Sequence, residues 1–442
     1  MASDWKEVIL DDVLMMSKAK IDSKDIDIES YVSTDNMLPD FGGVTVAEKL
    51  PSASKFTAYK AEDILFSNIR TYFRKLWIAN KDGGCSNDVI VFKAREGINP
   101  SFGFYSLMNE EFIQYTVQTS KGTKMPRGDK EAMKIYPLSL PPLSEQKAIA
   151  HILGSLDDKI ELNRQMNETL EAMAQALFKS WFVDFDPVID NALAAGNAIP
   201  DELLERAEQR QAIEKKDNSD IQNLFPNAFE FTEEMGWIPK GWGVSKLGEY
   251  IEVKRGGSPR PIHDYLVPKG LPWVKISDAT ASNSRFLVET KQFIKPEGLN
   301  KTTLLKKGSL ILSNSATPGL PKFLDLDACI HDGWLHFPKK KIFTDNYLYQ
   351  LFLVVRQELL MQGNGSVFTN LKTDILKNHM VVVPNIDVLN YFDNWINSFH
   401  NKIHAVQIDV DNLSRIRDTL LPKLMSGELR ISDAAELVEE VV

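Results

Sequence analysis

The side chains best suited to binding a ligand are basic and polar residues in four loops, three of which contain both glycine and proline. Two loops lie in the N-terminal third, "NIRTYFRK" over 68–75 and "KGTKMPRG" over 121–128. Two others, "KRGGSPRP" over 254–261 and "SNSATPG" over 313–319, lie in the second half. Lys and Arg neutralise phosphates, and Arg, Asn, Ser and Thr also hydrogen-bond to base edges. One such loop could simply be solvated, but recurrence at matching places favours contact with double-stranded DNA. The expected contact residues are Arg70, Arg74, Lys121, Lys124, Arg127, Lys254, Arg255, Arg260, Asn314, Ser315, Thr317 and Lys340.

Sequence motifs for catalysis are missing. The chain has no G-x-x-x-x-G-K-[ST], G-x-G-x-x-G, G-x-S-x-G or H-E-x-x-H pattern, and no Asn/Asp-Pro-Pro-aromatic motif of amino-methyltransferases. Glu252 and Lys254 have the spacing that ends a nuclease carboxylate-lysine site, but no well-placed Asp precedes them, so a strand explains them better. His400 and His404 are one helical turn apart and lack a third metal ligand. We therefore expect no catalytic residue, metal or cofactor in this chain.

Composition and charge favour a soluble protein of several domains. A length of 442 residues exceeds one ordinary core and predicts two or three domains. The net charge of −10 is unevenly distributed, because residues 184–234 hold 13 acidic and 4 basic residues and the last twelve residues add −4. The remainder is mildly basic, as a DNA-binding surface requires. The two cysteines, Cys85 and Cys329, exclude a disulfide framework and suit the cytoplasm, and no signal peptide or membrane span is expected.

The sequence contains an internal duplication, which we detect in three places. Trp5 corresponds to Trp242, and Ser67–Asn68 corresponds to Ser313–Asn314, at spacings of 237 and 246 residues. A third match has a spacing of 243 residues and pairs Gly122 with Gly365, Lys134 with Lys377, and Pro141 with Pro384. Each copy is predicted to be a mixed α/β module of about 135 residues followed by one long helix.

The two expected helices, about 142–182 and 385–423, carry apolar residues at a 3.5-residue period, which is typical of a coiled coil. The apolar seam comprises Ile149, Leu153, Leu156, Ile160, Leu170 and Leu177 in the first helix, and Phe392, Ile396, Phe399, Ile403, Leu413 and Leu420 in the second. Antiparallel pairing of helices about 60 Å long would place the two modules at opposite ends. Asn163 and Asn167 in this pattern either fix the register or face solvent, and Pro422 is expected to bend or end the second helix.

The predicted fold class is therefore α/β (α+β), duplicated, with two modules separated by an antiparallel coiled coil. The predicted segments are a first module over 1–141, a long helix over 142–183, an acidic linker over 184–241, a second module over 242–384, a second long helix over 385–426 and a C-terminal tail over 427–442.

This plan, together with a central stretch that runs from "PLSLPPLSEQKAIAHILGSLDDKIELNRQ" to "ALFKSWFVDFDPV", resembles the specificity subunits of type I restriction-modification systems. "LFPNAFEFTEEMGWIPKGW", "KRGGSP" and the ending "LLPKLMSGELRI" are also similar to that family. The resemblance implies that the modules are target recognition domains, each recognising half of a split DNA sequence. It also implies an antiparallel spacer that docks two methyltransferase subunits. Those subunits use S-adenosylmethionine to methylate adenine, and motor-nuclease subunits with ATP and Mg complete the restriction enzyme.

The two copies differ in detail, and other functions stay open. The second copy has "VPNIDVLN" where the first has "LPPLSEQ", and the first module has no Gly-Gly-Ser-Pro segment near Lys18–Lys20. Identical DNA contacts in the two modules are therefore not expected. An enzyme, either a nuclease or a fused methyltransferase, would bind a metal or S-adenosylmethionine alone. A coiled-coil adaptor without a DNA role would bind protein through its modules instead.

Overall fold

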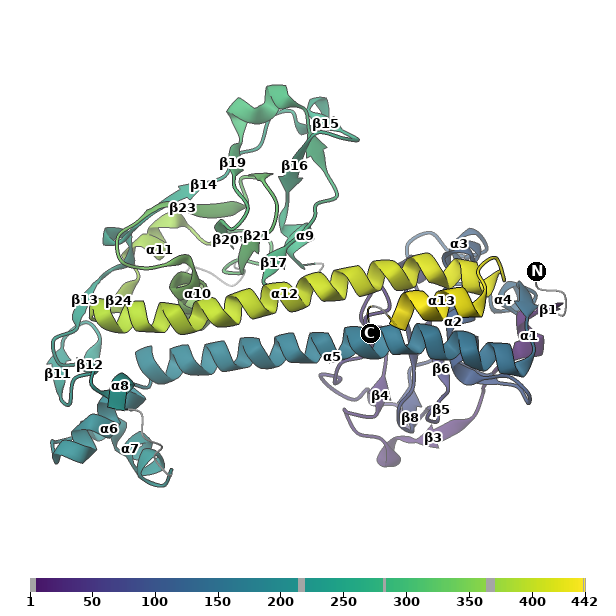
Figure 1. The fold of residues 1–442 in the computed structure, drawn as a ribbon, viewed down its shortest axis with the longest axis horizontal. Helices are drawn as coiled ribbons and strands as arrows, with labels where there is room; N and C mark the ends of the chain where they lie inside the picture. The colour runs from purple at the N-terminus through teal and green to yellow at the C-terminus, as the bar shows by residue number, and fades with distance from the viewer. Residues whose placement is uncertain (1–4, 214–218, 281–283, 363–369, 440, 442) are drawn as a thin grey trace. The chain divides into compact units, whose positions relative to one another are not determined.

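The computed structural model describes residues 5–213, 219–280, 284–362, 370–439 and 441. The chain forms two compact units, Met1–Arg164 with Ile408–Val442, and Gln165–Gln407. Two helices of 40 residues, α5 (Leu143–Phe182) and α12 (Ile386–Met425), contribute to both units (Figure 1). In the described part of the chain, no helix combines the length and the apolar character that a membrane span needs.

The first module begins and ends in neighbouring strands, because β1 (Lys6–Ile9) pairs antiparallel with β10 (Pro137–Leu140). One sheet has the order β2 (Leu14–Met16), β9 (Val89–Ala94), β6 (Ile64–Ser67) and β7 (Leu76–Ile78). The other has the order β3 (Lys20–Asp22), β5 (Lys55–Tyr59), β8 (Gly83–Cys85) and β4 (Tyr31–Val32). The helices are α1 (Leu10–Val13), α2 (Pro100–Met108), α3 (Glu110–Gln118) and α4 (Lys130–Lys134), and α2 contacts β6, β7 and β9.

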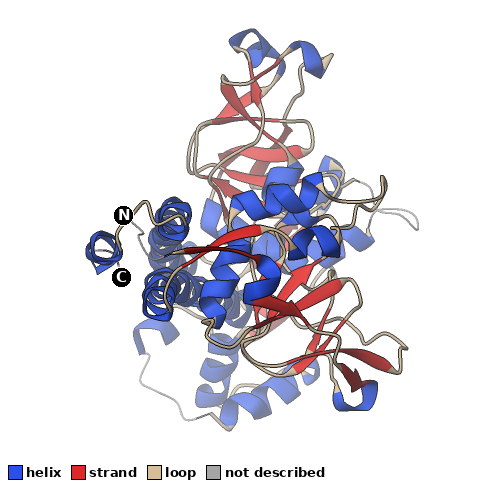
Figure 2. Ribbon diagram, turned by 90° about the vertical axis from the view of Figure 1, so that its right-hand side faces the viewer, coloured by secondary structure: helices blue, strands red, loops and turns tan. Residues whose placement is uncertain are grey.

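The second module has the same closure, with β13 (Gly243–Lys246) paired to β24 (Met380–Val383). Its first sheet has the order β14 (Ile251–Arg255), β23 (Trp334–Lys340), β20 (Leu310–Ser313), β21 (Pro321–Leu324) and β17 (Phe286–Leu287). Its second sheet has the order β15 (Leu266–Val267), β18 (Phe293–Ile294), β16 (Leu271–Val274), β22 (Ala328–Ile330) and β19 (Thr303–Leu305). The helices are α9 (Ile276–Thr280), α10 (Asp345–Met361) and α11 (Thr373–Asn378), and both α10 and α11 contact the first sheet. Figure 2 distinguishes the helices of the chain in blue from its strands in red.

The sheet topology confirms the internal duplication. The order β2-β9-β6-β7 in the first module corresponds to β14-β23-β20-β21 in the second. In the other sheets, β8 lies between a parallel β4 and an antiparallel β5, as β22 lies between a parallel β16 and an antiparallel β19. Cys85 in β8 and Cys329 in β22 therefore occupy equivalent central strands, and both are buried free thiols. Among the residue pairs that revealed the duplication, only Gly122 and Gly365 cannot be compared, because Gly365 lies outside the described residues.

The long helices run antiparallel within each unit. In the first unit, residues from the first half of α5 share a core with residues from the second half of α12, and Asp157 pairs with Arg417 at 2.7 Å. In the second unit, the late part of α5 packs on the early part of α12, where Phe178 lies 5.8 Å from Phe392 between ring centroids. Among the seam residues, Ile149, Leu153, Leu156, Ile160, Phe392, Ile396, Ile403, Leu413 and Leu420 are at most 5% exposed. Leu170, Leu177 and Phe399 are partly buried.

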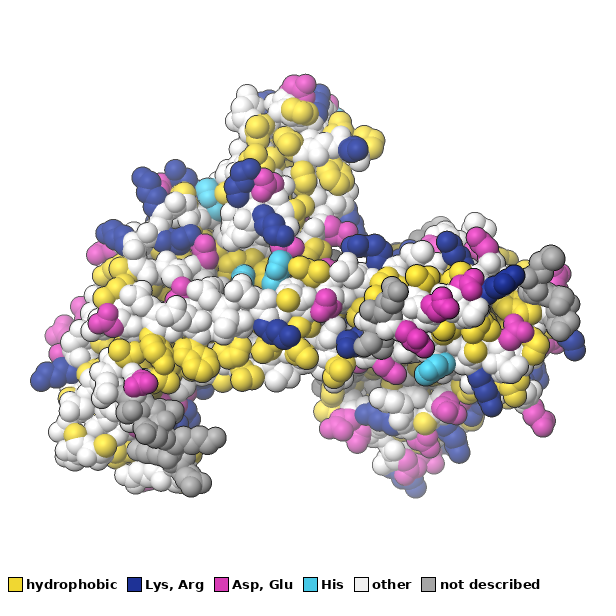
Figure 3. All heavy atoms as spheres, in the orientation of Figure 1, with side chains coloured by type: hydrophobic (Ala, Val, Ile, Leu, Met, Phe, Trp, Pro, Cys, Tyr) yellow, Lys and Arg dark blue, Asp and Glu magenta, His cyan; other side chains and the backbone are white. Residues whose placement is uncertain are grey.

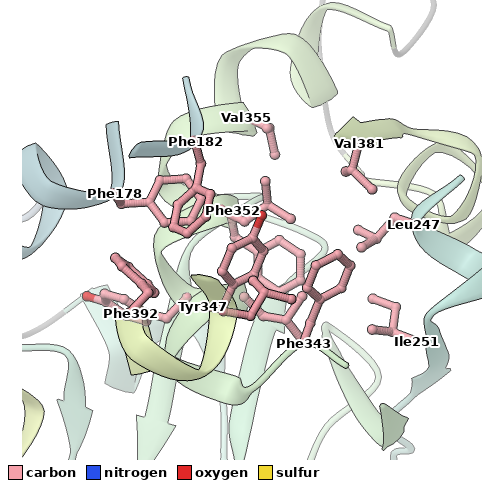
Figure 4. Close-up of a cluster of buried hydrophobic side chains, with 14 of the residues drawn as sticks. Phe178, Phe182, Leu247, Ile251, Phe343, Tyr347, Phe352, Val355, Val381 and Phe392 are labelled. Atoms are coloured by element: carbon pink, nitrogen blue, oxygen red, sulfur yellow. The ribbon is translucent and has the colours of Figure 1, made fainter. Parts of the chain in front are cut away.

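The apolar face of α5 is wider in the second unit than a coiled-coil seam. Phe178 and Phe182 lie outside the 3.5-residue pattern, yet they are 1% and 7% exposed. They point toward Phe392 of α12 and Tyr347 of α10 (Figure 4). Their burial follows from the third helix, because α10 covers a flank of α5 that two paired helices alone would leave in solvent.

The polar residues and the proline of the long helices differ in their burial and in their effect on the helix. Asn163 is 5% exposed, so of the two alternatives left open for it the solvent-facing one is wrong, whereas Asn167 is half-buried. Arg417 is 8% exposed, and its charge is paired with Asp157. Pro422 does not end α12, which continues to Met425. A proline in the last turn is tolerated because few backbone hydrogen bonds remain to be lost there.

The acidic linker is folded around internal ion pairs of the second unit. It contains α6 (Asp186–Ala195), α7 (Leu204–Gln211), α8 (Ser219–Gln222) and the hairpin of β11 (Phe229–Thr232) and β12 (Gly236–Pro239). Arg206 binds both oxygens of Asp186 at 2.7 and 2.8 Å, and Arg210 pairs with Asp190. In the first unit, α13 (Ile431–Glu439) follows α12 and packs into the first-unit core through Ala434 and Val438.

Candidate nucleic-acid interface

In the first module, Asn68 joins three segments that are distant in the sequence. It directly follows β6, its backbone N–H donates to the carbonyl oxygen of Asp88 at 2.8 Å, and its own carbonyl accepts from Gly128 at 3.1 Å. The side chain is 7% exposed, and its Oδ1 has no hydrogen-bond partner among the described residues. A Cβ on Gly128 would lie 2.2 Å from Met133 Cε and 3.0 Å from Asn68 Oδ1, so a larger residue there would displace the Met133 side chain.

Asn314 forms the equivalent junction in the second module. It follows β20, its N–H donates to the Gly333 carbonyl at 2.8 Å, and its carbonyl accepts from Leu371 at 2.6 Å. Its side chain is 3% exposed, and Oδ1 again lacks a described partner. Two residues further on, Arg70 and Ala316 both adopt left-handed backbone conformations, with φ of 49° and 57°. The same strained turn therefore recurs at the end of β6 and β20.

Two of the predicted loops lie side by side in the first module. The N–H of Arg70 donates to the Pro126 carbonyl at 2.8 Å, and Ile69 forms an isolated β-bridge with Arg127. Arg127 is paired with Asp88 at 2.8 Å, and Lys121 is paired with Asp129 at 2.5 Å. Among the residues that the structure describes, no carboxylate pairs with Arg70 or Lys124. These two cations are thus available to phosphates without breaking an ion pair.

Arg74 is less suited to DNA contact than the sequence suggests. Its guanidinium lies 2.8 Å from Glu110 at the start of α3 and 3.6 Å from Asp40. These two carboxylates satisfy its charge and fix the loop on the module. Tyr72 and Phe73, between Arg70 and Arg74, are 49% and 39% exposed, with ring centroids 4.8 Å apart. They present aromatic surface beside the unpaired Arg70.

In the second module, predicted residues converge on Asp332. Its carboxylate accepts hydrogen bonds from Ser258 Oγ at 2.7 Å and Arg260 Nη2 at 3.2 Å. Its carbonyl accepts from Arg255 Nε and from Asn314 Nδ2. Partial burial opposes ionisation of Asp332, but the Ser258 hydrogen bond and the nearby cationic groups together lower its pKa. Asp332 therefore stays charged at neutral pH.

The glycines of "KRGGSPRP" allow this convergence. A Cβ on Gly256 would lie 2.4 Å from the carbonyl oxygen of His331, the residue before Asp332. Only glycine lets the loop after β14 pass so close to the end of β22. The first module, which has no such segment after β2, builds its site without this loop.

The remaining predicted residues of the second module are dispersed. Ser315 forms an isolated bridge with Asn370, and its carbonyl accepts from the N–H of Thr317 at 2.6 Å. Lys254 lies in β14 and pairs with Glu252 at 3.1 Å. Lys340 lies at the other end of the β14–β23 pair, opposite Ile251, where it binds Asp345 at 2.8 Å. Lys340 is thus separated from Asp332, because successive residues of an extended strand advance about 3.3 Å each.

Three polar residues of these junctions were not predicted. Asp88 and Asp332 precede strands and carry no local motif. Asn370 is bridged to Ser315 as Arg127 is bridged to Ile69, so the two occupy equivalent positions. The constant offset of 243 residues between Gly122 and Gly365 also relates Arg127 to Asn370, and following that offset would have found it.

The two histidines of α12 belong to a packing interface. His404 Nε2 lies 2.8 Å from Asp325, and the His400 ring packs on Phe323, with 4.7 Å between centroids. Within the described ranges, no group of three or more His, Cys, Asp or Glu side chains is placed to hold a metal ion.

The duplicated junction coincides with a duplicated family match. The family model described as the type I restriction modification DNA specificity domain matches residues 2–172 and again 239–406. The chain belongs to this family. Members of the family that match this specificity subunit in sequence include the type I restriction enzyme HindI specificity subunit of Haemophilus influenzae. It is 27% identical, with 97% of this chain and 100% of the relative covered.

Other comparisons agree with this assignment. The type I restriction enzyme MjaIX specificity subunit of Methanocaldococcus jannaschii is 24% identical to this specificity subunit, and the match covers 77% of this chain and 71% of the relative. A crystal structure of the type I restriction-modification S subunit from M. genitalium has a TM-score of 0.52 at 14% identity, with 96% of each chain covered. That structure supports the fold. The named relatives are specificity subunits, which are non-catalytic.

Proposed function

We propose that this specificity subunit recognises a bipartite DNA sequence, one half through each module. The observation that carries the proposal is the duplicated junction, in which Asn68 and Asn314 each assemble three loops with basic and polar side chains. Arg70, Lys124 and Arg127 would contact DNA in the first module. Arg255, Arg260 and Ser315, with the unpredicted Asn370, would do so in the second. Backbone phosphates supply affinity, and base edges supply specificity.

We infer that the paired helices set the distance between the two half-sites. Spacing along DNA combines a distance with a rotation, so two modules at a fixed separation accept only one gap. Deleting seven residues from α5 and seven from α12 keeps the apolar period and should change the gap while leaving each half-site sequence intact. A matched control deletes residues from the acidic linker only. An unchanged gap in the helix variant would refute the role in spacing.

The chemistry is assigned to partner subunits. We propose that the helices dock two methyltransferase subunits, which supply S-adenosylmethionine and methylate adenine, and that motor-nuclease subunits bind ATP and Mg. Exposed apolar side chains on the helices of the second unit support docking, since Met173 of α5 is 51% exposed and Trp395 of α12 is 46% exposed. Figure 3 shows such hydrophobic surface along the long helices. The complex would act in the cytoplasm.

Methylome sequencing tests the whole proposal. Cells that contain this chain with its methyltransferase partner should acquire methyladenine in one split motif, and cells without the chain should lose that motif. A coiled-coil adaptor would leave the methylome unchanged. A chain with its own catalytic centre would methylate or cleave DNA without any partner.

A further inference from the structure

Each loop junction holds one exposed ion pair between an arginine and an aspartate. Arg127 Nη2 lies 2.8 Å from Asp88 Oδ1 in the first module, and Arg260 Nη2 lies 3.2 Å from Asp332 Oδ2 in the second. Asp88 directly precedes β9, and Asp332 lies two residues before β23, so both carboxylates occupy the same end of equivalent strands. The Asp88 carbonyl accepts from the backbone N–H of Asn68, whereas the Asp332 carbonyl accepts from the side-chain Nδ2 of Asn314, because Asp332 lies one position earlier relative to its strand.

The two arginines reach these aspartates from unrelated loops. Arg127 comes from the segment between α3 and α4, whereas Arg260 comes from the segment after β14. The residue equivalent to Arg127 in the second module is Asn370. The pair is therefore not a by-product of the duplicated backbone, because each module obtains the same arrangement of charge with a different loop.

A carboxylate at such a site weakens binding to non-cognate DNA. The side chains are well exposed, with 57% for Arg127 and 38% for Asp88, and 78% for Arg260 and 40% for Asp332. An exposed ion pair contributes little stability, so the arginine can turn toward DNA. The aspartate then faces either phosphates, which repel it, or a base edge. Only the exocyclic amino group of cytosine or adenine can donate a hydrogen bond to it in the major groove.

We propose that Asp88 and Asp332 are specificity-determining residues, which weaken binding to non-cognate DNA and accept a hydrogen bond from a base amino group in the target. The inference rests on the proposed recognition of DNA by these modules. An arginine and an aspartate side by side offer a donor and an acceptor to one base pair. This combination matches an amino group beside a ring nitrogen or a carbonyl oxygen, whereas the phosphate backbone offers the aspartate no hydrogen-bond donor.

The test compares Asp88→Asn with Glu131→Gln in the complete methyltransferase complex. Glu131 lies in the same module, pairs with Lys134 at 2.7 Å and is 79% exposed, so both variants remove one negative charge. Dissociation constants are measured for a duplex with the methylated motif and for a scrambled duplex. Asp88→Asn should bind the scrambled duplex roughly fivefold more tightly or better, and target binding should not improve. Glu131→Gln should change both constants by the same factor.

The Arg127 partner and the second module provide independent checks. In an Arg127→Ala background, Asp88→Asn should have less effect on the ratio of the two dissociation constants, because the pair acts as a unit. Asp332→Asn should reproduce the loss of discrimination, with Asp327→Asn as its control, since Asp327 pairs with Lys306 at 2.6 Å away from Asp332. If Asp88→Asn fails to fold, these second-module variants still test the inference.

The outcomes separate this inference from the proposed function. Unchanged discrimination in both aspartate variants, in a wild-type complex that does discriminate, would overturn the role of the aspartates alone. A wild-type complex that binds the two duplexes equally would overturn the proposed function. Equal weakening on both duplexes would assign the aspartates to loop structure and would also overturn the inference.

Discussion

The guanidinium of Arg285 binds both carboxylate oxygens of Glu171 at 2.5 Å, and this ion pair ties the second module to helix α5. The Arg285 side chain is fully buried and stacks on Tyr349, with Cζ 4.6 Å from the ring centroid. Its Nη1 has no hydrogen-bond partner among the described residues. Because this arginine side chain is shielded from solvent, Glu171 supplies the carboxylate that pairs with its buried charge.

Glu171→Ala should therefore destabilise the second unit by roughly 3–5 kcal/mol, since it leaves a buried charge without a partner. Glu168→Ala, one turn away on the exposed face of the same helix, is the matched control and should change stability by less than about 0.5 kcal/mol. Urea denaturation with hydrogen exchange, which locates the transition in the second unit, measures both. Equal stability of the two variants would contradict this role for the pair.

Stability of the second unit should also depend on pH through His400. Burial, with Arg285 and His404 nearby, lowers the pKa of His400 from 6.5 to about 4, and Asp325 opposes this only in part. The folded state therefore binds this proton less tightly than the unfolded state. The contribution of neutral His400 to the free energy of unfolding is complete above pH 6.5. It is lost, by up to about 3 kcal/mol, as the pH falls toward 4.

His400→Leu should reduce the dependence of unfolding free energy on pH between 4 and 6.5, because the leucine keeps the contact with Phe286 and Phe323 and does not titrate. The remaining dependence comes in part from His331, His336 and His379, since burial lowers the pKa of each. His263→Gln, which replaces an exposed histidine of the same module, is the matched control. Denaturation midpoints at a series of pH values give the slopes. A His400→Leu protein with the wild-type slope would show that other groups dominate acid unfolding.

Two cations of the first module should have separable effects on DNA. Lys124 is exposed and suits phosphate contact, so Lys124→Ala should weaken binding to every sequence and reduce the salt dependence by about one charge. Arg127 lies beside the junction, so Arg127→Ala should relax one position of the first half-site. Salt titrations and methylome sequencing measure the two effects, and the second half-site serves as the internal control. An unchanged motif and affinity would remove Arg127 from the interface.

The sequence predicted the elements more fully than the contacts between them. The seam residues were predictable because burial along a helix follows a fixed period, whereas Phe178 and Phe182 depend on α10, which arrives from far along the chain. The junctions were located because Ser67–Asn68 and Ser313–Asn314 recur. Their acidic members were not, since Asp332 meets Arg260 across 72 residues of sequence and no local pattern reports such a pair. The position of Lys340, at the other end of the β14–β23 pair from Asp332, could not be predicted because sequence alone gives no strand register, and its contact with DNA stays a prediction.

The buried Asn163 should make the long helices less stable and more specific in their alignment. Its Nδ2 has no described hydrogen-bond partner, and a polar group buried without a partner costs about 1–3 kcal/mol. Asn163→Leu should therefore raise the unfolding free energy of the first unit by about that amount. Asn401→Leu, at an exposed position of α12, is the matched control and should give no gain.

The same substitution should loosen the register of the two helices, because a lone polar residue in an apolar seam favours the alignment that best accommodates it. In the Asn163→Leu protein, methylome sequencing should then show a second gap length between the half-sites beside the wild-type one. A more stable protein with a single gap would leave Asn163 as an unfavourable core residue without a role in register. A less stable protein would contradict both expectations, since it would mean that the amide finds a partner in the assembled complex.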